Sequence, residues 1–355
     1  MLLVRSHFAV GAISLTLSVR CTSIVSEIAQ TVAEAGERAL IKRITDRIHS
    51  PPWLVVGPGD DAAVIEPQRG TLDVVTTDAL VEGIHFDRRF CPPDAIGHKA
   101  LAVNLSDLAA MGASPRAALL SLVLPDSLSV SDVDGVLDGL LSLAGRYNVA
   151  LAGGNITRST GPLVVDVTAI GSVGRRRVLK RDGARPGDEV YVTGRIGAGA
   201  AGLRALQAGG SDPDIQAHYL RPEPRVRAGT LLGRNRAATA CIDLSDGLSD
   251  GLIQLAEASG VGIAIDRAAL PVDRAILRWF EQDREDPALA AVSGGDDYEL
   301  LFTSRPAQRG RLRAVRQHVG KLPITKIGVV TSERKVVLKT PDGERPLPGG
   351  FEHFK

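Results

Sequence analysis

The stretch AIGHKALAVNLSDLAAMGASP, residues 95–115, predicts the helix that connects the fold of this chain with its candidate functional residues. Ile96, Ala100, Val103 and Asp107 follow one another at spacings of four, three and four, so they share one face of a predicted helix. That apolar face ends in a carboxylate. Because a carboxylate among apolar side chains is costly unless it is paired, hydrogen-bonded or bound to a metal, Asp107 is a candidate functional residue.

On both sides of this stretch the chain alternates between patterns typical of helices and of strands. Helices are predicted over residues 27–48, 95–111, 131–147, 200–208 and 248–259, and strands over 53–56, 62–65, 72–77, 117–124, 150–151, 163–170 and 189–193. This alternation indicates two α/β or α+β domains. A polar stretch rich in glycine and arginine, residues 174–188, marks their boundary. We therefore predict an N-terminal domain over 34–176 and a C-terminal domain over 177–355.

The bulk composition excludes several classes of function. A formal net charge of +1 gives no electrostatic reason to bind nucleic acid or an acidic membrane, and 4% aromatic residues are too few for a base-stacking surface. Cys21, Cys91 and Cys241 form no CxxC pair, which favours a reducing, cytoplasmic setting. The apolar run at residues 8–19 is too short to span a membrane. We interpret residues 1–33 as an extension that is disordered or that precedes the true start.

Four acidic motifs, beyond Asp107, lie on glycine-rich turns or at the ends of predicted elements. They are GPGDD (57–61), LDVVTTD (72–78), DLSD (243–246) and SGGDD (293–297). Each alone is consistent with a plain turn or, for Asp243 and Ser245, with the cap of a helix that begins near Asp246. Taken together, and without a matching histidine cluster, these hard oxygen ligands suit several Mg²⁺ ions that neutralise a polyphosphate.

A glycine motif offers a rival interpretation. After the strand predicted at 189–193 comes GAGAAG, residues 197–202, which has the GxGxxG spacing of a dinucleotide-binding turn. Asp212 and Asp214 lie near the distance expected for a ribose-binding acid, but they sit in a predicted loop rather than at the end of a strand. The simpler interpretation is a glycine-opened helix that packs closely on a strand. P-loop and protein-kinase signatures are absent from the sequence.

Taken in order, eight stretches resemble the thiamine-monophosphate kinase family, of the superfamily that includes aminoimidazole ribonucleotide synthetase and selenophosphate synthetase. They are GDDAAV (59–64), TTDALVEGIHF (76–86), KALAVNLSDLAAMGASP (99–115), GGNITRS (153–159), RDGARPGD (181–188), LRPEPR (220–225), DLSDGL (243–248) and SGGDDYELLFT (293–303). This resemblance covers roughly residues 34 to 355 and leaves the N-terminal extension outside. Eight ordered motifs are far more specific than any one of them.

The resemblance implies three sets of site residues. The magnesium ligands would be Asp61, Thr76, Thr77, Asp78, Asp107, Asn155, Asp243 and Asp246, of which Asp107 and Asp246 would be essential. The nucleotide would contact Gly154, Asn155, Arg181 and Ser245, and thiamine phosphate would contact His85, Asp296 and Phe351. The family transfers the γ-phosphoryl group of ATP directly and in line to thiamine phosphate, without a phosphoenzyme.

The resemblance also implies the two-domain fold of aminoimidazole ribonucleotide synthetase. In that fold the N-terminal domain would bind ATP and magnesium and would form a homodimer through its sheet, while a C-terminal α/β domain would complete the active site. Two residues depart from the family's usual pattern: Asn155 stands where Asp is common, and Phe351 stands where Trp or Tyr is usual. Another ATP-dependent synthetase of the superfamily, or a protein that only binds nucleotide, stays open as an alternative.

Overall fold

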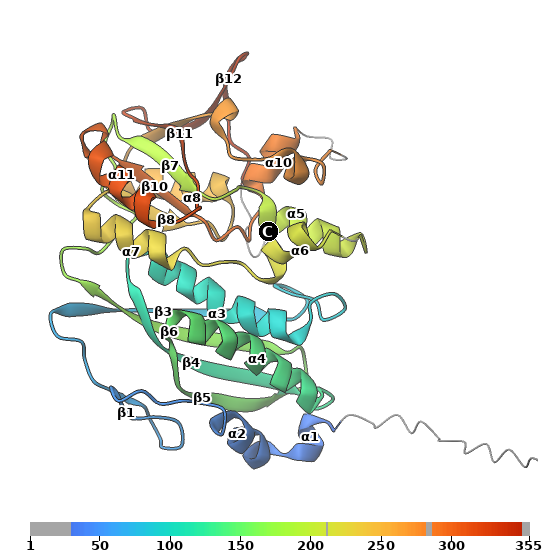
Figure 1. Cartoon of the computed structure of the whole chain (residues 1–355). Helices are drawn as coiled ribbons and strands as arrows, with labels where there is room; N and C mark the ends of the chain where they lie inside the picture. Colours follow the sequence, from blue (N-terminus) through green and yellow to red (C-terminus); the bar gives the residue numbers. More distant parts are fainter. Residues whose placement is uncertain (1–29, 211, 282–285, 350–355) are drawn as a thin grey trace, which may run out of the picture.

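The computed structural model describes residues 30–210, 212–281 and 286–349, and these form two sheets with helices packed on them (Figure 1). The first sheet has the strand order β3-β6-β4-β5. Its strands are β3 (Thr71–Val81), β6 (Val164–Gly174), β4 (Ser114–Pro125) and β5 (Ala150–Ser159). Strands β4 and β5 are parallel, and the other neighbours are antiparallel. One face of this sheet is covered by the helices α3 (Pro93–Ala110) and α4 (Val130–Tyr147).

The two helices α3 and α4 cross at unusually close range because glycines line their contact. A Cβ atom on Gly97 would lie 1.8 Å from the carbonyl oxygen of Val136, and one on Gly139 would lie 1.8 Å from that of Asp94. Helix α4 begins at the cap Ser129, whose side chain accepts a hydrogen bond from the Asp132 amide. Helix α3 is buried on nearly all sides, since it also contacts α7 and β8 of the second half.

The other face of the first sheet is partly covered by an N-terminal strap. The strap consists of α1 (Val32–Ala35), α2 (Glu37–Thr45), β1 (Leu54–Val56) and β2 (Val64–Ile65). One helix was expected here over 27–48, but Gly36 at φ +78° separates α1 from α2, and residues before 30 lie outside the described chain. Val32 is buried and its amide donates to Leu128, so residues 30–33 of the predicted extension already contact the first half.

The second half is built on a seven-stranded sheet of order β13-β12-β9-β11-β7-β10-β8. Its strands are β7 (Glu189–Thr193), β8 (Ala240–Asp243), β9 (Gly262–Asp266), β10 (Leu300–Ser304), β11 (Ile324–Thr331), β12 (Val336–Thr340) and β13 (Gly343–Pro346). The helices are α5 (Ala198–Gln207), α6 (Pro213–Leu220), α7 (Val226–Asn235), α8 (Leu248–Ser259), α9 (Arg274–Leu277), α10 (Pro287–Ser293) and α11 (Arg309–His318). The protein therefore has a two-domain α/β fold. The exact boundary at 176/177 stays a prediction between the last strand of one sheet and the first of the other.

Strands β3, β4, β5 and β6 are longer than the sequence predicts, and the extensions of β3 and β5 change where site residues lie. Strand β3 runs on to Val81, so Asp78 lies inside the strand rather than at its end. Strand β5 runs from Ala150 to Ser159, so Gly154 and Asn155 belong to a strand rather than to a turn. The reason is tertiary: β5 stays paired with β4 along its whole length, although its second half has no apolar alternation to reveal it.

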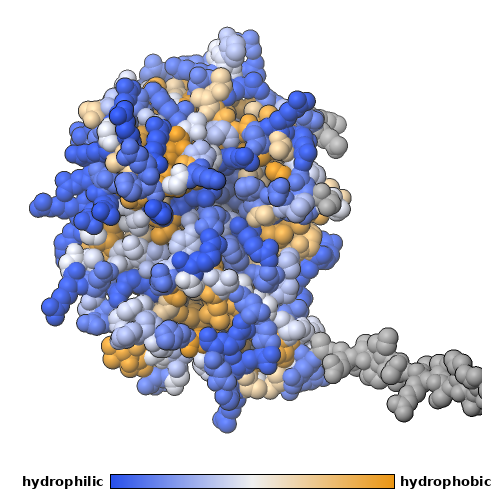
Figure 2. Space-filling view, in the orientation of Figure 1, coloured by the Kyte–Doolittle hydropathy of each residue, from blue (hydrophilic) through white to orange (hydrophobic). Residues whose placement is uncertain are grey.

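The surface is mostly hydrophilic. Figure 2 shows hydrophobic residues gathered in small separate patches between larger hydrophilic areas on the face in view. Among the described residues, no helix combines the length and the apolarity that crossing a membrane requires.

Candidate functional site

An acidic cluster lies where the two halves of the molecule meet. Thr76 and Asp78 share the side of β3 that faces α3, because side chains alternate along a strand, and the Thr76 hydroxyl donates to the carboxylate of Asp107 on α3. Asp243 is the last residue of β8, and its carboxylate accepts a 2.7 Å hydrogen bond from Ser106. Strand β3, helix α3 and strand β8 thus bring three carboxylates together from segments far apart in the sequence.

These carboxylates repel one another. Burial, and then the charges of Asp107 and Asp243, raise the pKa of Asp78 to about 7. Burial, and then the charge of Asp107, raise the pKa of Asp243 to about 7. Burial also raises the pKa of Asp107, although the Thr76 hydrogen bond and the charge of Arg181 oppose this. Ionisation of all the carboxyl groups in such a cluster is favourable only when a cation neutralises their charge.

The donor set fits magnesium, but it does not form a complete cage. Within the described ranges no three His, Cys, Asp or Glu side chains converge closely enough to hold a metal ion by themselves. Mg²⁺ commonly takes only one or two carboxylates and completes its octahedral shell with water and substrate phosphate oxygens. The oxygen-only chemistry and the raised carboxyl pKa values therefore agree with a cation that is shared with a phosphate ligand.

The predicted magnesium set divides between the two faces of the first sheet. Thr77 points away from α3, where its hydroxyl lies 3.1 Å from an Asp166 carboxylate oxygen and 3.0 Å from the Thr168 hydroxyl. Asp61 and Asn155 also lie on this outer side and line the same cavity as Asp166 and Thr168. The structure therefore brings Thr76, Asp78, Asp107 and Asp243 together and sets Thr77, Asp61 and Asn155 apart from them.

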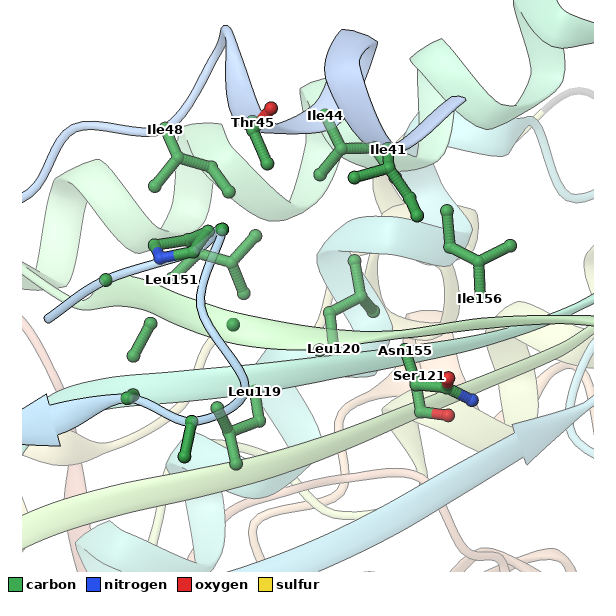
Figure 3. Close-up of a pocket in the computed structure, with 18 of the residues that line it drawn as sticks. Ile41, Ile44, Thr45, Ile48, Leu119, Leu120, Ser121, Leu151, Asn155 and Ile156 are labelled. Atoms are coloured by element: carbon green, nitrogen blue, oxygen red, sulfur yellow. The ribbon is translucent and has the colours of Figure 1, made fainter. Parts of the chain in front are cut away.

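The outer cavity has a volume of about 740 Å³ and lies between the strap and the sheet. In Figure 3, isoleucines of α2 and the segment after it form one wall, while Ser121 and Asn155 contribute polar groups on the opposite wall. Gly154 is required here for packing, since a Cβ atom would lie 1.9 Å from the carbonyl oxygen of Leu120. The mixture of apolar walls and a few polar groups is typical of a small-molecule site.

Two loops of the second half form one braced unit beside the acidic cluster. The Asp296 amide donates to the Ser245 carbonyl oxygen at 2.7 Å, and the Tyr298 amide donates to that of Leu244 at 2.8 Å. A Cβ atom on Gly247 would meet the Gly294 carbonyl oxygen at 2.6 Å. The loop that carries Ser245 and Asp246 is therefore held in place by the SGGDD turn. The helix predicted over 248–259 is confirmed as α8 (Leu248–Ser259), but the alternative that Asp243 or Ser245 caps it is wrong, since Asp243 ends a strand and Gly247 is the cap residue.

The residues expected at the substrate pocket approach each other across the domain junction. His85 follows β3, and its Nδ1 accepts a 3.1 Å hydrogen bond from the Val81 amide. Asp296 lies in the SGGDD turn and forms a 3.0 Å ion pair with Lys99 of α3. Phe351 lies outside the described residues.

Arg181 lies close enough to the acidic cluster for its charge to oppose the rise that burial causes in the pKa of Asp107 and of Asp243. Its Nη1 donates a 2.7 Å hydrogen bond to Gln254 of α8. This placement is consistent with a cation that faces the phosphates of a ligand at the cluster.

The GxGxxG motif does not form a dinucleotide site. The amides of Gly197 and Gly199 already donate to the carboxyl group of Asp297, at 2.8 and 3.0 Å, so the start of α5 is occupied by a side chain of the protein. Strand β7 before it is antiparallel to both of its neighbours, whereas a dinucleotide-binding turn belongs to a parallel βαβ unit. A Cβ atom on Gly199 would lie 2.3 Å from the Asp296 carbonyl oxygen, so close packing explains the glycine.

This pair of sheets and its shared acidic junction define a class of two-domain proteins. Residues 59–173 match the family model of the AIR synthase related protein N-terminal domain, and residues 185–340 match that of the C-terminal domain. Solved structures of hydrogenase maturation protein HypE share the fold, one in complex with ATP at a TM-score of 0.75 and 20% identity.

Comparison with curated relatives identifies one family within this class of two-domain proteins. Thiamine-monophosphate kinase of Escherichia coli K12 is 42% identical over 330 residues, 90% of this chain and 98% of that protein, and that of Bacillus subtilis is 37% identical over 328 residues, 89% and 98%. The crystal structure of the Stenotrophomonas maltophilia K279a enzyme aligns at a TM-score of 0.74 and 38% identity, covering 84% of this chain and 94% of that one. AaThiL complexed with AMPPCP and TMP aligns at 0.71 and 33%, covering 92% and 100%. The chain belongs to the thiamine-monophosphate kinase family.

Proposed function

We propose that this protein transfers the γ-phosphoryl group of ATP to thiamine monophosphate and releases thiamine diphosphate and ADP. The observation that carries the proposal is the buried acidic cluster at the domain junction, with carboxyl pKa values raised to about 7 at Asp78 and Asp243. Such a cluster calls for cations and for the phosphates that accompany them. A relative at 33% identity was solved with AMPPCP and TMP, which have the chemistry of the two proposed substrates.

The chain's own residues would act by positioning and by charge. Asp78, Asp107, Asp243 and Asp246 would hold Mg²⁺, which supplies neutralisation of the ATP phosphates as charge moves between them. Arg181 would face the same phosphates from the second half. The acceptor is a phosphate that is already anionic, so a general base is not required, and alignment of the two substrates is the main task of the site.

Gly154 and Asn155 of β5 would contact a nucleotide on the outer side of the first sheet, whereas Ser245 would contact a nucleotide at the acidic cluster across the junction. Asn155 offers an oxygen ligand without a negative charge, so a cation there would be held by fewer charges than in relatives with Asp. Thr77 and Asp61, on the outer side of the sheet, would contribute oxygen atoms only to a cation placed on that side.

Thiamine phosphate would bind beside His85 and Asp296. Because the Nδ1 atom of His85 accepts from a backbone amide, a neutral ring carries its proton on Nε2. The Asp296 carboxylate offers a negative charge to the cationic thiazolium ring of thiamine. Phe351 would supply an aromatic face to the same ligand.

We also propose a homodimer formed through the first sheet and a cytoplasmic location. Strand β3 is an edge strand of eleven residues, and Val75 on its outer side is 63% exposed. A long open edge with an exposed apolar side chain is a surface that pairing with a second copy would cover. The proposal of a cytoplasmic location is supported by the free buried thiols of Cys91 and Cys241, which suit a reducing compartment.

A coupled assay tests the proposed function. Purified protein is incubated with thiamine monophosphate, ATP and Mg²⁺, and thiamine diphosphate and ADP are followed together. Equal amounts of both products, lost with EDTA, would support the proposal. ADP without thiamine diphosphate would favour another synthetase of the superfamily. Nucleotide binding without any turnover would favour a protein that only binds.

A further inference from the structure

One buried cation connects the two residues that we place in the substrate pocket. Lys99 of α3 is 3% exposed, and its ammonium group has three neighbours from three separate segments. It lies 3.0 Å from Asp296 Oδ1, 3.5 Å from the carbonyl oxygen of His85 and 3.7 Å from the centre of the Tyr219 ring on α6. A buried lysine is costly unless such partners compensate it, so its place calls for an explanation.

The contacts that the protein makes to the Asp296 carboxylate are concentrated on one of its two oxygen atoms. The Tyr298 hydroxyl donates to the same oxygen as Lys99, Oδ1, at 3.0 Å. Burial, and then the Asp296 charge, raise the pKa of Tyr298 well above its usual range, so the phenol stays protonated and donates. Within the described residues, no hydrogen bond from the protein reaches Oδ2 of Asp296, whose side chain is 30% exposed, and the Lys99 ammonium approaches Oδ1 most closely. Two donors thus fix one oxygen, and the other remains available to a ligand.

The backbone that carries this carboxylate is unusual as well. Asp296 and Tyr298 both adopt positive φ, +67° and +49°, which non-glycine residues rarely do. Contacts on several sides must hold such a turn in place. Lys99 contributes one of these contacts from the other half of the molecule, and Tyr219 supports the opposite side of the pocket by donating a 2.8 Å hydrogen bond to the His85 carbonyl oxygen.

We propose that Lys99 is a positioning residue for the acceptor substrate. By holding Asp296 Oδ1 and approaching the His85 carbonyl oxygen, Lys99 fixes the distance between the two walls of the thiamine pocket and leaves Oδ2 directed to the cationic ligand. This inference rests on the proposed function. It adds a residue that acts through Asp296, without touching the reacting phosphates.

The test separates the two substrates. In Lys99→Met the side chain keeps its length and loses its charge, so we expect the KM for thiamine monophosphate to rise about tenfold or more, while the KM for ATP changes less than about threefold. Lys99→Arg, which keeps the charge, should recover part of the loss. Arg146→Met is the matched control, because it removes a different ion pair between the halves, the 2.6 Å pair with Glu223, and should leave the KM for thiamine monophosphate unchanged.

A double-mutant cycle shows whether the effect passes through Asp296. In an Asp296→Asn background, Lys99→Met should cause no further rise in the KM for thiamine monophosphate. This double variant carries the test even if Lys99→Met alone fails to fold, because it leaves no unpaired charge. Equal losses for both substrates, additive effects in the cycle, or an unchanged KM would overturn the inference.

Direct titration of thiamine monophosphate into the wild-type protein separates the two proposals. If the wild type binds and turns over the substrate but Lys99→Met binds it equally well, the role of Lys99 fails and the function stands. If the wild type neither binds nor turns over thiamine monophosphate, the proposed function fails and this inference falls with it.

Discussion

The Ser106 hydroxyl of α3 donates a 2.7 Å hydrogen bond to the Asp243 carboxylate at the end of β8, and this contact joins the two halves of the molecule at the acidic cluster. The two residues are 137 positions apart. Because Asp107 follows Ser106 directly, the same turn of α3 places its carboxylate beside Asp243. The site therefore depends on the docking of the two halves as well as on the carboxylates themselves.

Asp107→Asn should lower kcat by on the order of 10²–10³-fold, because a charge that would hold the cation is lost while the shape of the side chain is kept. The fold should survive. Removing a buried carboxylate that repels its neighbours leaves the melting temperature equal to or above that of the wild type. Turnover and thermal melting, measured on the same preparations, check both halves of the prediction.

The control for this variant is Asp73→Asn. Asp73 is exposed on the outer side of the same region, at the start of β3, and should show wild-type turnover. Near-normal activity of Asp107→Asn would remove Asp107 from the proposed metal set.

Asp78→Asn should change the pH dependence of stability in metal-free buffer. The folded pKa of Asp78 is raised to about 7, so the folded chain holds this proton more tightly than the unfolded chain does. The Asp78 side chain therefore contributes favourably to the stability of the folded state at low pH, and this contribution is lost as the pH rises from about 4 to about 7. Because Asn is neutral throughout, the melting temperature of the variant minus that of the wild type should increase between about pH 5 and about pH 8.

Excess Mg²⁺ should reduce or reverse this difference at about pH 8, because a bound cation compensates the ionised wild-type carboxylate. Sodium chloride at equal ionic strength is the control for general screening. If the melting-temperature difference stays constant across pH without metal, Asp78 does not titrate in this range.

The sequence was sufficient for the parts of the site that depend on local pattern. The apolar face that ends in Asp107 predicts α3 and a carboxylate near its end, and the glycine-rich acidic segment at 293–297 also follows from local pattern. The alternative interpretation of Asp243 as a helix cap is wrong: Asp and Ser before a helix resemble a cap, but Asp243 ends β8, an edge strand of only four residues. Local patterns do not distinguish these two cases.

Other parts depend on contacts that no local pattern encodes. The second half of β5 has the composition of a loop and is held as a strand by pairing with β4. The Lys99–Asp296 ion pair joins the two halves, so neither residue's neighbours in the sequence reveal it. The division of Thr76 and Thr77 between two faces, in contrast, follows from the alternation of side chains along a strand.

Gly139→Ala should destabilise the protein by about 1–3 kcal/mol or more, because the new methyl group must displace the α3 backbone, whose Asp94 carbonyl oxygen lies 1.8 Å from the Cβ position. Gly145→Ala on the same helix is the matched control. It has open space around the Cβ position and should stabilise α4 by about 0.5–1 kcal/mol. Denaturant unfolding of both variants gives the two signs, and equal effects would contradict the close crossing of α3 and α4.

Val75→Asp should separate the proposed homodimer. Val75 is 63% exposed on the edge strand β3 of the first sheet, and a second copy paired there would bury it, so a new carboxylate would be desolvated at the contact. Val75→Thr keeps the size and the branched shape of the side chain and should remain dimeric. Light scattering coupled to size exclusion measures the mass of each. A wild-type monomer, or an aspartate variant with the mass of two chains, would place the contact elsewhere or remove it.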